Sequence, residues 1–239
     1  MINPPAIVIP AYQPNERLIT LVHGLRHQRP EQEIIIVDDG SDREKKKFFH
    51  ALQEYQVQLL EHPKNYGKGQ ALKTAFNYYL QKTAQPIGVV TADADGQHSI
   101  KDILILSDRL SKATEILYLG VRDFKKIPGT KIPWRSQFGN WMTARLFHMI
   151  SSIPVQDTQT GLRAIPSPLL QLVASSQSKA YEFEMEMLMI AAIHQIPIAT
   201  IPIETIYFDN NTQSHFKPLL DSIKVYKVIL KYFFQIVKK

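Results

Sequence analysis

Residues 87–100 read IGVVTADADGQHSI, and this stretch contains the pattern that the first half of the sequence repeats. A short apolar run ends in acidic and glycine residues, and a helical pattern follows at Ile100–Lys112. Ser99 and Asp102 form a weak capping box before that helix. The stretch therefore predicts a buried strand, a polar turn at its carboxyl end and a helix that covers the strand.

The same alternation continues on both sides of this stretch. Strands are expected at Ala6–Ile9, Glu33–Val37, Val57–Leu60, Ile87–Ala92 and Ile116–Val121. Apolar residues at helical spacing predict further helices at Arg17–His27, Arg43–Tyr55 and Gly69–Lys82, with a capping box of Ser41 and Glu44 before the second of them. This order predicts an α/β fold, a Rossmann-like three-layer sandwich with a mainly parallel central sheet.

The second half of the sequence is less regular. A basic loop, Arg122–Arg135, contains Pro128, Gly129 and Pro133 and cannot form one helix. Beyond it we expect a helix at Trp134–Ile150, a polar segment at Gln156–Arg163, a helix at Glu182–Gln195, strands within Ile198–Tyr207 and a closing helix at Pro218–Lys239. Residues 1–215 are expected to form one domain. Residues 216–239 should form a basic amphipathic helix that either belongs to it or contacts a membrane surface.

Composition limits the classes of function. The chain has 239 residues, of which 44% are hydrophobic, as expected for one globular domain. It has no cysteine, which excludes disulfides and thiolate chemistry and favours the cytoplasm. No signal peptide or membrane-spanning run is recognised. The formal charge of +6 favours polyanionic partners, but no nucleic-acid motif accompanies it, so nucleic acid is not an expected partner.

Two carboxylates, Asp93 and Asp95, follow the strand at Ile87–Ala92. Mg²⁺ and Mn²⁺ take oxygen ligands, commonly one or two carboxylates together with substrate phosphates. A turn at Gly96 would let Asp95 and Gln97 converge on one ion. A solvated turn uses the same residue types. The place of the pair at the end of an apolar strand, where such sheets bind ligands, favours a metal site.

Two more polar turns lie at predicted strand or helix ends. Capping would account for Ser41 and Asp42 after the second strand, but not for Asp39, which is expected to face a base or ribose. The turn Asn65–Gly69 places Lys68 between two glycines at a helix start, where backbone N–H groups can approach a phosphate. Its spacing is not that of a P-loop, and a plain glycine turn is the alternative.

Four motifs in this order carry a family resemblance: IVIPAY at Ile7–Tyr12, VDDGS at Val37–Ser41, NYGKG at Asn65–Gly69 and DADGQH at Asp93–His98. Together they resemble the inverting glycosyltransferases of family 2 with the GT-A fold, above all the dolichyl-phosphate mannose synthases and bacterial polyprenyl-phosphate glycosyltransferases. Later segments resemble the same branch: Arg122, Arg135 with Phe138–Asn140, Asp157–Arg163, Glu182–Glu184, and His215–Phe216 with Asp221–Ser222.

The chain departs from the family pattern in two respects. Glu16 lies two positions beyond the place that the family's opening motif gives its glutamate. The transmembrane helices that many bacterial members carry after the catalytic domain are also missing from this sequence.

The resemblance implies a role for each motif. The nucleotide-sugar would be bound by Pro10, Ala11, Tyr12, Asp39, Lys68, Asp93 and Ala94. The metal, Mg²⁺ or Mn²⁺, would be held by Asp93, Asp95 and Gln97. The implied catalytic residues are Asp95, Arg122, Arg135, Asp157 and Arg163. Arg122 and Arg135 would receive the acceptor phosphate, and Arg163 would help at either phosphate. Asp157 would be a base for a hydroxyl acceptor or, as we prefer, would orient Arg163.

These roles describe metal-dependent, inverting transfer of a sugar from a UDP- or GDP-sugar to a polyprenyl phosphate, undecaprenyl or dolichyl, in cell-envelope glycan modification. An ionised phosphate needs cations that orient it rather than a strong base. Two alternatives remain: a GT-A transferase that acts on a sugar hydroxyl in polysaccharide synthesis, and a non-catalytic nucleotide-sugar-binding module.

The basic C-terminal helix suggests where the protein acts. Its apolar residues recur at helical spacing among lysines, so it is expected in the headgroup region at the inner face of the cell membrane. This gives a peripheral, cytoplasmic location. The alternatives are packing on its own domain or against a small membrane partner protein.

Overall fold

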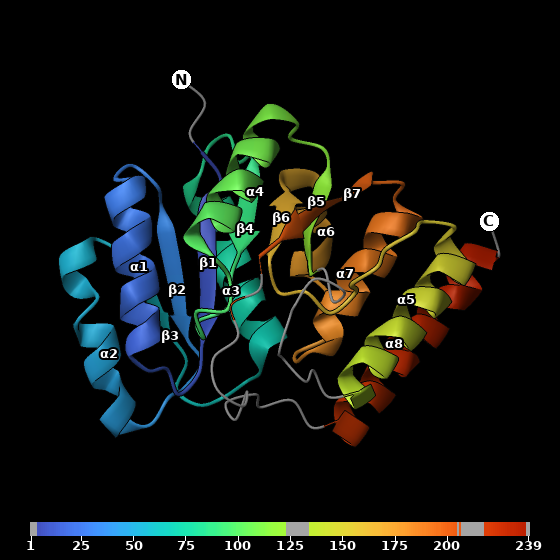
Figure 1. Cartoon of the computed structure of the whole chain (residues 1–239), viewed down its shortest axis with the longest axis horizontal. Helices are drawn as coiled ribbons and strands as arrows, with labels where there is room; N and C mark the ends of the chain where they lie inside the picture. Colours follow the sequence, from blue (N-terminus) through green and yellow to red (C-terminus); the bar gives the residue numbers. More distant parts are fainter. Residues whose placement is uncertain (1–3, 123–133, 205, 207–217, 238–239) are drawn as a thin grey trace.

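The computed structural model describes residues 4–122, 134–204, 206 and 218–237. They form a three-layer sandwich around a seven-stranded sheet of order β3-β2-β1-β4-β6-β5-β7 (Figure 1). The strands are β1 (Ala6–Ala11), β2 (Ile34–Asp38), β3 (Gln58–Glu61), β4 (Gly88–Thr91), β5 (Leu117–Arg122), β6 (Arg163–Pro166) and β7 (Ile198–Ile203). Only β6 among them is antiparallel to its neighbours, β4 and β5. The predicted α/β sandwich is confirmed.

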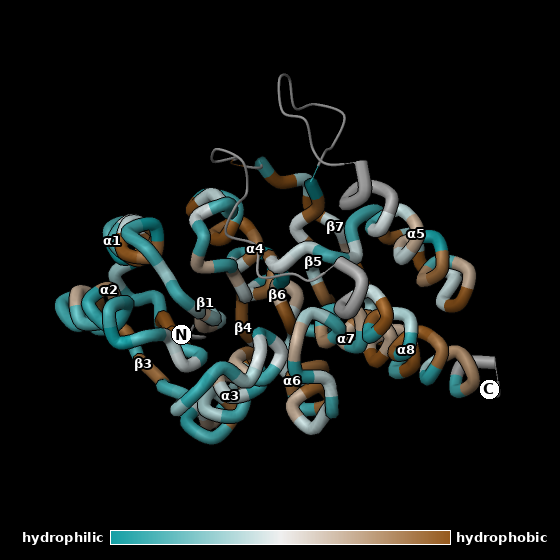
Figure 2. Tube along the Cα trace, turned by 90° about the horizontal axis from the view of Figure 1, so that it is seen from below, coloured by the Kyte–Doolittle hydropathy of each residue, from teal (hydrophilic) through white to brown (hydrophobic). Residues whose placement is uncertain are grey.

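Helices cover both faces of the sheet. One face carries α1 (Glu16–Gln28), α2 (Lys46–His50) and α4 (Ile100–Lys112), and the other carries α3 (Lys68–Lys82), α6 (Ser167–Ala174) and α7 (Glu182–Ile193) (Figure 2). Beyond α7 lie α5 (Trp134–Ser151) and α8 (Pro218–Val237). Successive strand residues serve opposite faces, because side chains alternate along a strand. Ile7 and Ile9 therefore enter the core under α1 and α4, while Val8 enters the core under α3.

Most predicted elements are present, with ends shifted by a few residues, but the expected helix Arg43–Tyr55 is wrong. Two 3₁₀ turns, Arg43–Lys45 and Gln53–Tyr55, flank the short α2. Ser41 does not cap a helix there, since its Oγ accepts the N–H of Gln13 at 2.9 Å. Ser99 does cap α4, with its Oγ 3.1 Å from the N–H of Asp102.

Two elements of the second half were not predicted. The polar segment Gln156–Arg163 leads into the central strand β6, and α6 follows directly. Strands were expected within Ile198–Tyr207, and this region contributes β7, which ends at Ile203. Residues 205 and 207 lie outside the described part.

The sheet brings the polar turns to one edge. Parallel strands β1, β2, β4 and β5 all end there, at the lower side of Figure 1. Because β6 runs the other way, the segment before it, Gln156–Leu162, reaches the same edge. Residues far apart in the sequence therefore meet at the carboxyl edge.

Helix α8 is packed on the domain and also carries an exposed apolar stripe. Val225, Val228, Ile229 and Tyr232 are buried against the neighbouring helices α5 and α7. Ile223, Leu230 and Phe234 are 52%, 58% and 61% exposed. At about 100° per residue, this second stripe lies on the side of the helix opposite the buried one. Within the described ranges, no helix combines the length and hydropathy that crossing a membrane needs.

Candidate active site

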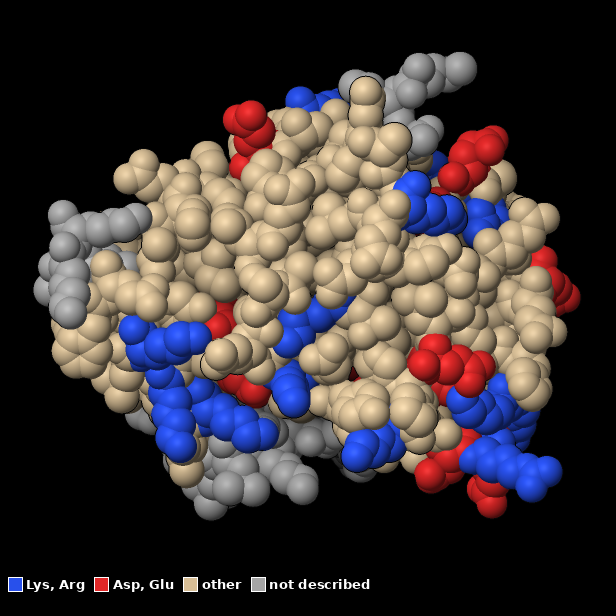
Figure 3. Space-filling view, turned by 180° about the vertical axis from the view of Figure 1, so that it is seen from behind, with Lys and Arg blue, Asp and Glu red and all other residues tan. Residues whose placement is uncertain are grey.

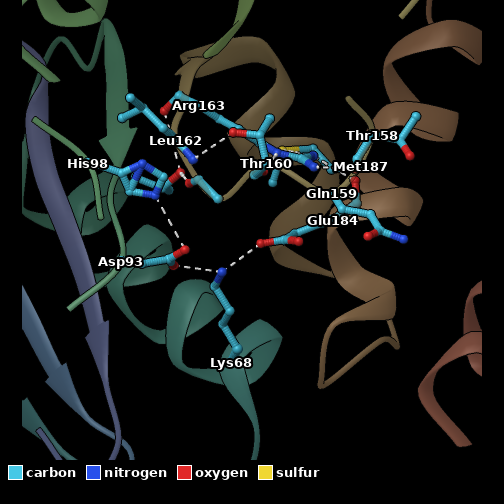
Figure 4. Close-up of polar contacts among 12 residues, drawn as sticks. Lys68, Asp93, His98, Thr158, Gln159, Thr160, Leu162, Arg163, Glu184 and Met187 are labelled. Carbon is cyan, nitrogen blue, oxygen red and sulfur yellow. Dashed lines mark hydrogen bonds and ion pairs between the residues drawn. The ribbon is translucent and has the colours of Figure 1, made fainter. Parts of the chain in front are cut away.

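Asp93 stands at the centre of a polar cluster at the carboxyl edge of the sheet. Lys68 Nζ lies 2.7 Å from Asp93 Oδ1, and His98 Nε2 lies 3.4 Å from Asp93 Oδ2 (Figure 4). Gly161 packs behind the carboxylate, where an added Cβ would lie 2.3 Å from Oδ2. The start of α3, the turn after β4 and the loop before β6 thus enclose one carboxylate.

The two carboxylates after β4 have different electrostatic surroundings. Burial acts to raise the pKa of Asp93, but the charges of Lys68, His98 and Arg122 outweigh it and hold that pKa below its usual range. Burial and then the charge of Asp93 raise the pKa of Asp95 to about 6. Asp95 is therefore a half-buried carboxylate beside a second one, a setting that a cation would relieve.

These side chains fit a hard divalent cation. Gly96 takes a φ of 76°, a left-handed turn that glycine adopts readily, and Asp95 Oδ1 accepts the N–H of Gln97 at 3.0 Å. The turn offers carboxylate and amide oxygens, the donors that Mg²⁺ and Mn²⁺ prefer. Within the described residues no three His, Asp or Glu side chains converge to hold an ion by themselves. Such a cation would need substrate oxygens as well, as magnesium sites commonly do.

Asp39 takes up two of the backbone N–H groups in the turn Asn65–Gly69. Asp39 is 2% exposed, and its carboxylate accepts the N–H groups of Tyr66 at 2.9 Å and Gly67 at 2.8 Å. His62 Nδ1 lies 2.7 Å from the same carboxylate. Asp39 therefore fixes this turn and takes up the N–H of Gly67, while its contact with a base or ribose stays a prediction.

The second glycine of that turn is needed for packing. A Cβ on Gly69 would lie 2.6 Å from Phe183 Cβ and 2.9 Å from the carbonyl oxygen of Ala180. Gly69 thus lets α3 approach the start of α7. This close approach brings Glu184 within reach of Lys68, whose Nζ lies 2.7 Å from Glu184 Oε1.

Arg122, at the end of β5, is held by Asp157. Its Nε and Nη2 donate to the Asp157 carboxylate at 2.7 and 3.2 Å, and the Asp157 side chain is fully buried. The prediction that Asp157 orients Arg163 is therefore wrong, because its hydrogen-bonded partner is Arg122. Arg122 borders a hollow of about 50 Å³ that is also lined by Asp93, Gln97, His98, Gln159, Thr160, Gly161 and Ile203.

Arg163 does not reach the surface of this hollow. It is 1% exposed, and its guanidinium donates to the carbonyl oxygens of Thr160, Thr158 and Glu184 at 2.9, 2.9 and 2.6 Å. Arg163 therefore has a structural role here rather than the expected contact with a phosphate. Arg163 ties the loop before β6 to the first turn of α7 (Figure 4).

The remaining predicted residues lie at or near the same edge. Pro10 and Ala11 end β1, and the half-buried Tyr12 follows them. Ala94 lies between the two carboxylates. Arg135 is on the first turn of α5, but its side chain lies outside the described part, as do His215 and Phe216. The structure brings together Lys68, Asp93, Asp95, Gln97, His98 and Arg122.

Three contacts of the site were missed: His98 and Gly161 against Asp93, and Glu184 on Lys68. His98, Gly161 and Glu184 all lie inside segments that carry the family resemblance. Nothing in the sequence connects His98 and Gly161 to Asp93, or Glu184 to Lys68.

Comparison with known proteins decides the family. Residues 6–166 match the sequence profile described as Glycosyl transferase family 2. The chain belongs to glycosyl transferase family 2. It is 30% identical over 224 residues to the UDP-N-acetylglucosamine–dolichyl-phosphate N-acetylglucosaminyltransferase of Methanococcus voltae, covering 84% of this chain and 85% of that protein. It is 24% identical over 205 residues to the polyprenol monophosphomannose synthase of Mycolicibacterium smegmatis, covering 82% and 75%.

A solved structure shares the fold of this family 2 enzyme. The mannosyltransferase PcManGT of Pyrobaculum calidifontis, determined with GDP-Man and Mn²⁺, aligns with a TM-score of 0.59 at 15% identity, covering all of this chain and 66% of that one. The fold is therefore GT-A. The family match and the two relatives show that the protein is a glycosyltransferase.

Proposed function

We propose that this glycosyltransferase carries out metal-dependent, inverting transfer of a sugar from a UDP- or GDP-sugar to a polyprenyl phosphate, undecaprenyl or dolichyl, in cell-envelope glycan modification. The observation that carries the proposal is the Arg122 guanidinium, which buried Asp157 holds beside the Asp93 carboxylate. This places a fixed cation next to the acidic residues of the donor side. The names of the two relatives, which refer to dolichyl phosphate and a polyprenol, support this acceptor class.

On the donor side, Asp95 and Gln97 would hold the metal, with Asp93 beside them. Lys68 adds a positive charge that ion pairs keep in place. Pro10, Ala11, Tyr12 and Ala94 would border the nucleotide at the same edge. A bound divalent metal would supply Lewis-acid stabilisation of the charge on the departing nucleoside diphosphate.

On the acceptor side, Arg122 would hold and orient the lipid phosphate, with Arg135 of α5 as a second cation. An arginine fork binds phosphate oxygens in pairs, and the phosphate attacks without losing a proton to a base. A hydroxyl acceptor would need a base. The base candidate, Asp157, is fully buried and paired with Arg122, which argues against that alternative.

The exposed stripe on α8 supports action at a membrane surface. Ile223, Leu230 and Phe234 point away from the domain, and exposed Lys224 and Lys227 lie on the same helix. Lys and Arg side chains gather at this end of the molecule in Figure 3. Apolar side chains beside lysines suit the headgroup region of an anionic leaflet, so we assign the stripe to the inner membrane face rather than to a partner protein.

The test of the reaction is nucleoside diphosphate release from a panel of UDP- and GDP-sugars with Mg²⁺ or Mn²⁺, with and without undecaprenyl phosphate. We expect release that depends on the lipid and is lost in Asp95→Ala. Asp108→Ala, at an exposed ion pair with Arg29, is the matched control and should keep activity. Release that depends instead on a glycan acceptor would favour the hydroxyl alternative. No release from folded protein would refute the proposal.

Membrane binding has a separate test. Sedimentation with anionic phosphatidylglycerol vesicles should show binding that Leu230→Ser with Phe234→Ser greatly weakens. Ile206→Ser, at an exposed apolar residue outside α8, should bind like the wild type. Equal binding of all three forms would remove α8 as the contact surface.

A further inference from the structure

Lys68 places a positive charge on Asp93. Its Nζ lies 2.7 Å from Asp93 Oδ1 and 2.7 Å from Glu184 Oε1 (Figure 4). The side chains of Lys68 and Glu184 are 17% and 9% exposed, so water screens the contact between them only weakly. Two carboxylates from different elements therefore share one ammonium group.

The position of Glu184 is fixed by its backbone. Arg163 Nη1 donates to the Glu184 carbonyl oxygen at 2.6 Å, and the same guanidinium holds the carbonyl oxygens of Thr158 and Thr160. Gly69 packs the start of α3 against Phe183, the neighbour of Glu184. The first turn of α7 and the first turn of α3 are thus held together, and Glu184 keeps Lys68 over the acidic turn after β4.

Both oxygens of Asp93 have close neighbours, although its side chain is 30% exposed. Lys68 takes Oδ1, while His98 and the backbone at Gly161 lie against Oδ2. A divalent cation that approaches Asp93 meets an ammonium at a distance where repulsion between like charges is strong. Asp95 then remains as the other carboxylate, with the amide of Gln97. A donor diphosphate would add the negative charges and oxygens that this turn lacks.

We infer that Glu184 is a positioning residue that holds Lys68 on Asp93, and that this ion pair keeps the substrate-free site weak for divalent cations, so that the metal enters together with the donor diphosphate. The inference rests on the proposed use of a nucleotide-sugar and metal. It assigns Lys68 two tasks: it neutralises Asp93 before the donor arrives, and it contributes to diphosphate binding afterwards.

The first test measures Mn²⁺ binding to the whole chain by electron paramagnetic resonance, without nucleotide. We expect weak binding by the wild type and at least about tenfold tighter binding by Lys68→Met, because the competing ammonium is gone. Lys68→Met with Glu184→Gln also removes the buried Glu184 carboxylate, which would lose its lysine partner in the single variant, and should show the same gain. Lys82→Met is the matched control, since Lys82 pairs with Glu33 at 2.9 Å on the surface; its affinity should not change.

The second test adds UDP or GDP. Because Glu184→Gln removes the charge that holds Lys68 on Asp93, this variant should bind Mn²⁺ alone more tightly than the wild type but less tightly than Lys68→Met, and it should lose about fivefold or more in affinity for the Mn²⁺–nucleotide complex. If Glu184 served stability alone, Glu184→Gln would lower the melting temperature without changing these two affinities in different ways.

Some outcomes would overturn the inference and others only the proposed function. Tight Mn²⁺ binding by the nucleotide-free wild type, or no gain in both Lys68 variants, would overturn the inference. Failure of every form to bind Mn²⁺ with UDP or GDP would refute the proposed donor instead. The nucleotide-free comparison would still decide the role of Lys68.

Discussion

Replacing Asp157 with asparagine separates the two roles that this residue can have in the reaction. The change keeps the size of the side chain and one oxygen that accepts hydrogen bonds, but it removes the charge opposite Arg122. If Asp157 orients Arg122, the variant should bind the acceptor phosphate poorly. If Asp157 were a base, the variant should lose the chemical step.

The structure gives the size of each effect. Breaking a fully buried ion pair costs about 3–5 kcal/mol. Here the Arg122 side chain is 27% exposed and the amide oxygen still accepts a hydrogen bond, so we expect the free energy of unfolding to fall by about 2 kcal/mol. Loss of one well-aimed contact between arginine and phosphate is worth ~1.5–3 kcal/mol, or about 10- to 100-fold in the KM for the lipid. Loss of a base slows the chemical step by about 10²–10⁴-fold.

Urea denaturation and steady-state kinetics measure both quantities, with polyprenyl phosphate varied at saturating donor. We expect a raised lipid KM, a donor KM near that of the wild type and a largely retained kcat. The control is Asp108→Asn at the exposed pair with Arg29, which should change stability by less than about 0.5 kcal/mol. If turnover at saturating lipid instead fell by about 100-fold or more while the lipid KM stayed unchanged, the orienting role would be refuted.

Two further predictions concern other contacts. Gly161→Ala would place a Cβ 2.3 Å from Asp93 Oδ2, so we expect Asp93 to move and Mn²⁺–nucleotide affinity, measured by titration, to fall by about tenfold, with about 1–3 kcal/mol lost in stability. Burial acts to raise the pKa of Glu186, but hydrogen bonds from Ser178 and Tyr232 more than offset it and lower that pKa. A lowered folded-state pKa stabilises the fold above the unfolded-state pKa and loses this effect as pH falls through the folded-state value. The difference in melting temperature between wild type and Glu186→Gln should therefore shrink from about pH 6 to about pH 3, and a constant difference would contradict this reasoning.

Most of the first half of the fold could be predicted because its signals are local. Each of β1, β2, β4 and β5 is an apolar run of its own, and the helices between them have apolar stripes. The strand β6 could not be predicted in this way. It has four residues, begins with the buried Arg163 and ends in Pro166, and its place between β4 and β5 is set by tertiary pairing.

The same distinction applies to the site. The acidic turn after β4 and Arg122 at the end of β5 were predicted because each lies in a contiguous motif. The pairing of Lys68 with Glu184 and of Arg122 with Asp157 was not predicted, because these partners are 116 and 35 positions apart in the sequence. Arg163 shows the converse error. Its residue type suits a ligand, yet backbone carbonyl oxygens of nearby segments accept its hydrogen bonds.

The reversed strand β6 also constrains how the chain folds during synthesis. The strands β3, β2, β1 and β4 pair with one another and are complete once residue 91 has been made. Strand β5 ends at residue 122, but both of its neighbours, β6 and β7, come later in the chain. A nascent chain that has emerged from the ribosome only as far as β5 therefore exposes unpaired edges on β4 and β5, which are sites for aggregation. A nascent chain whose emerged part ends between residues 122 and 163 should be the most chaperone-dependent intermediate of this protein.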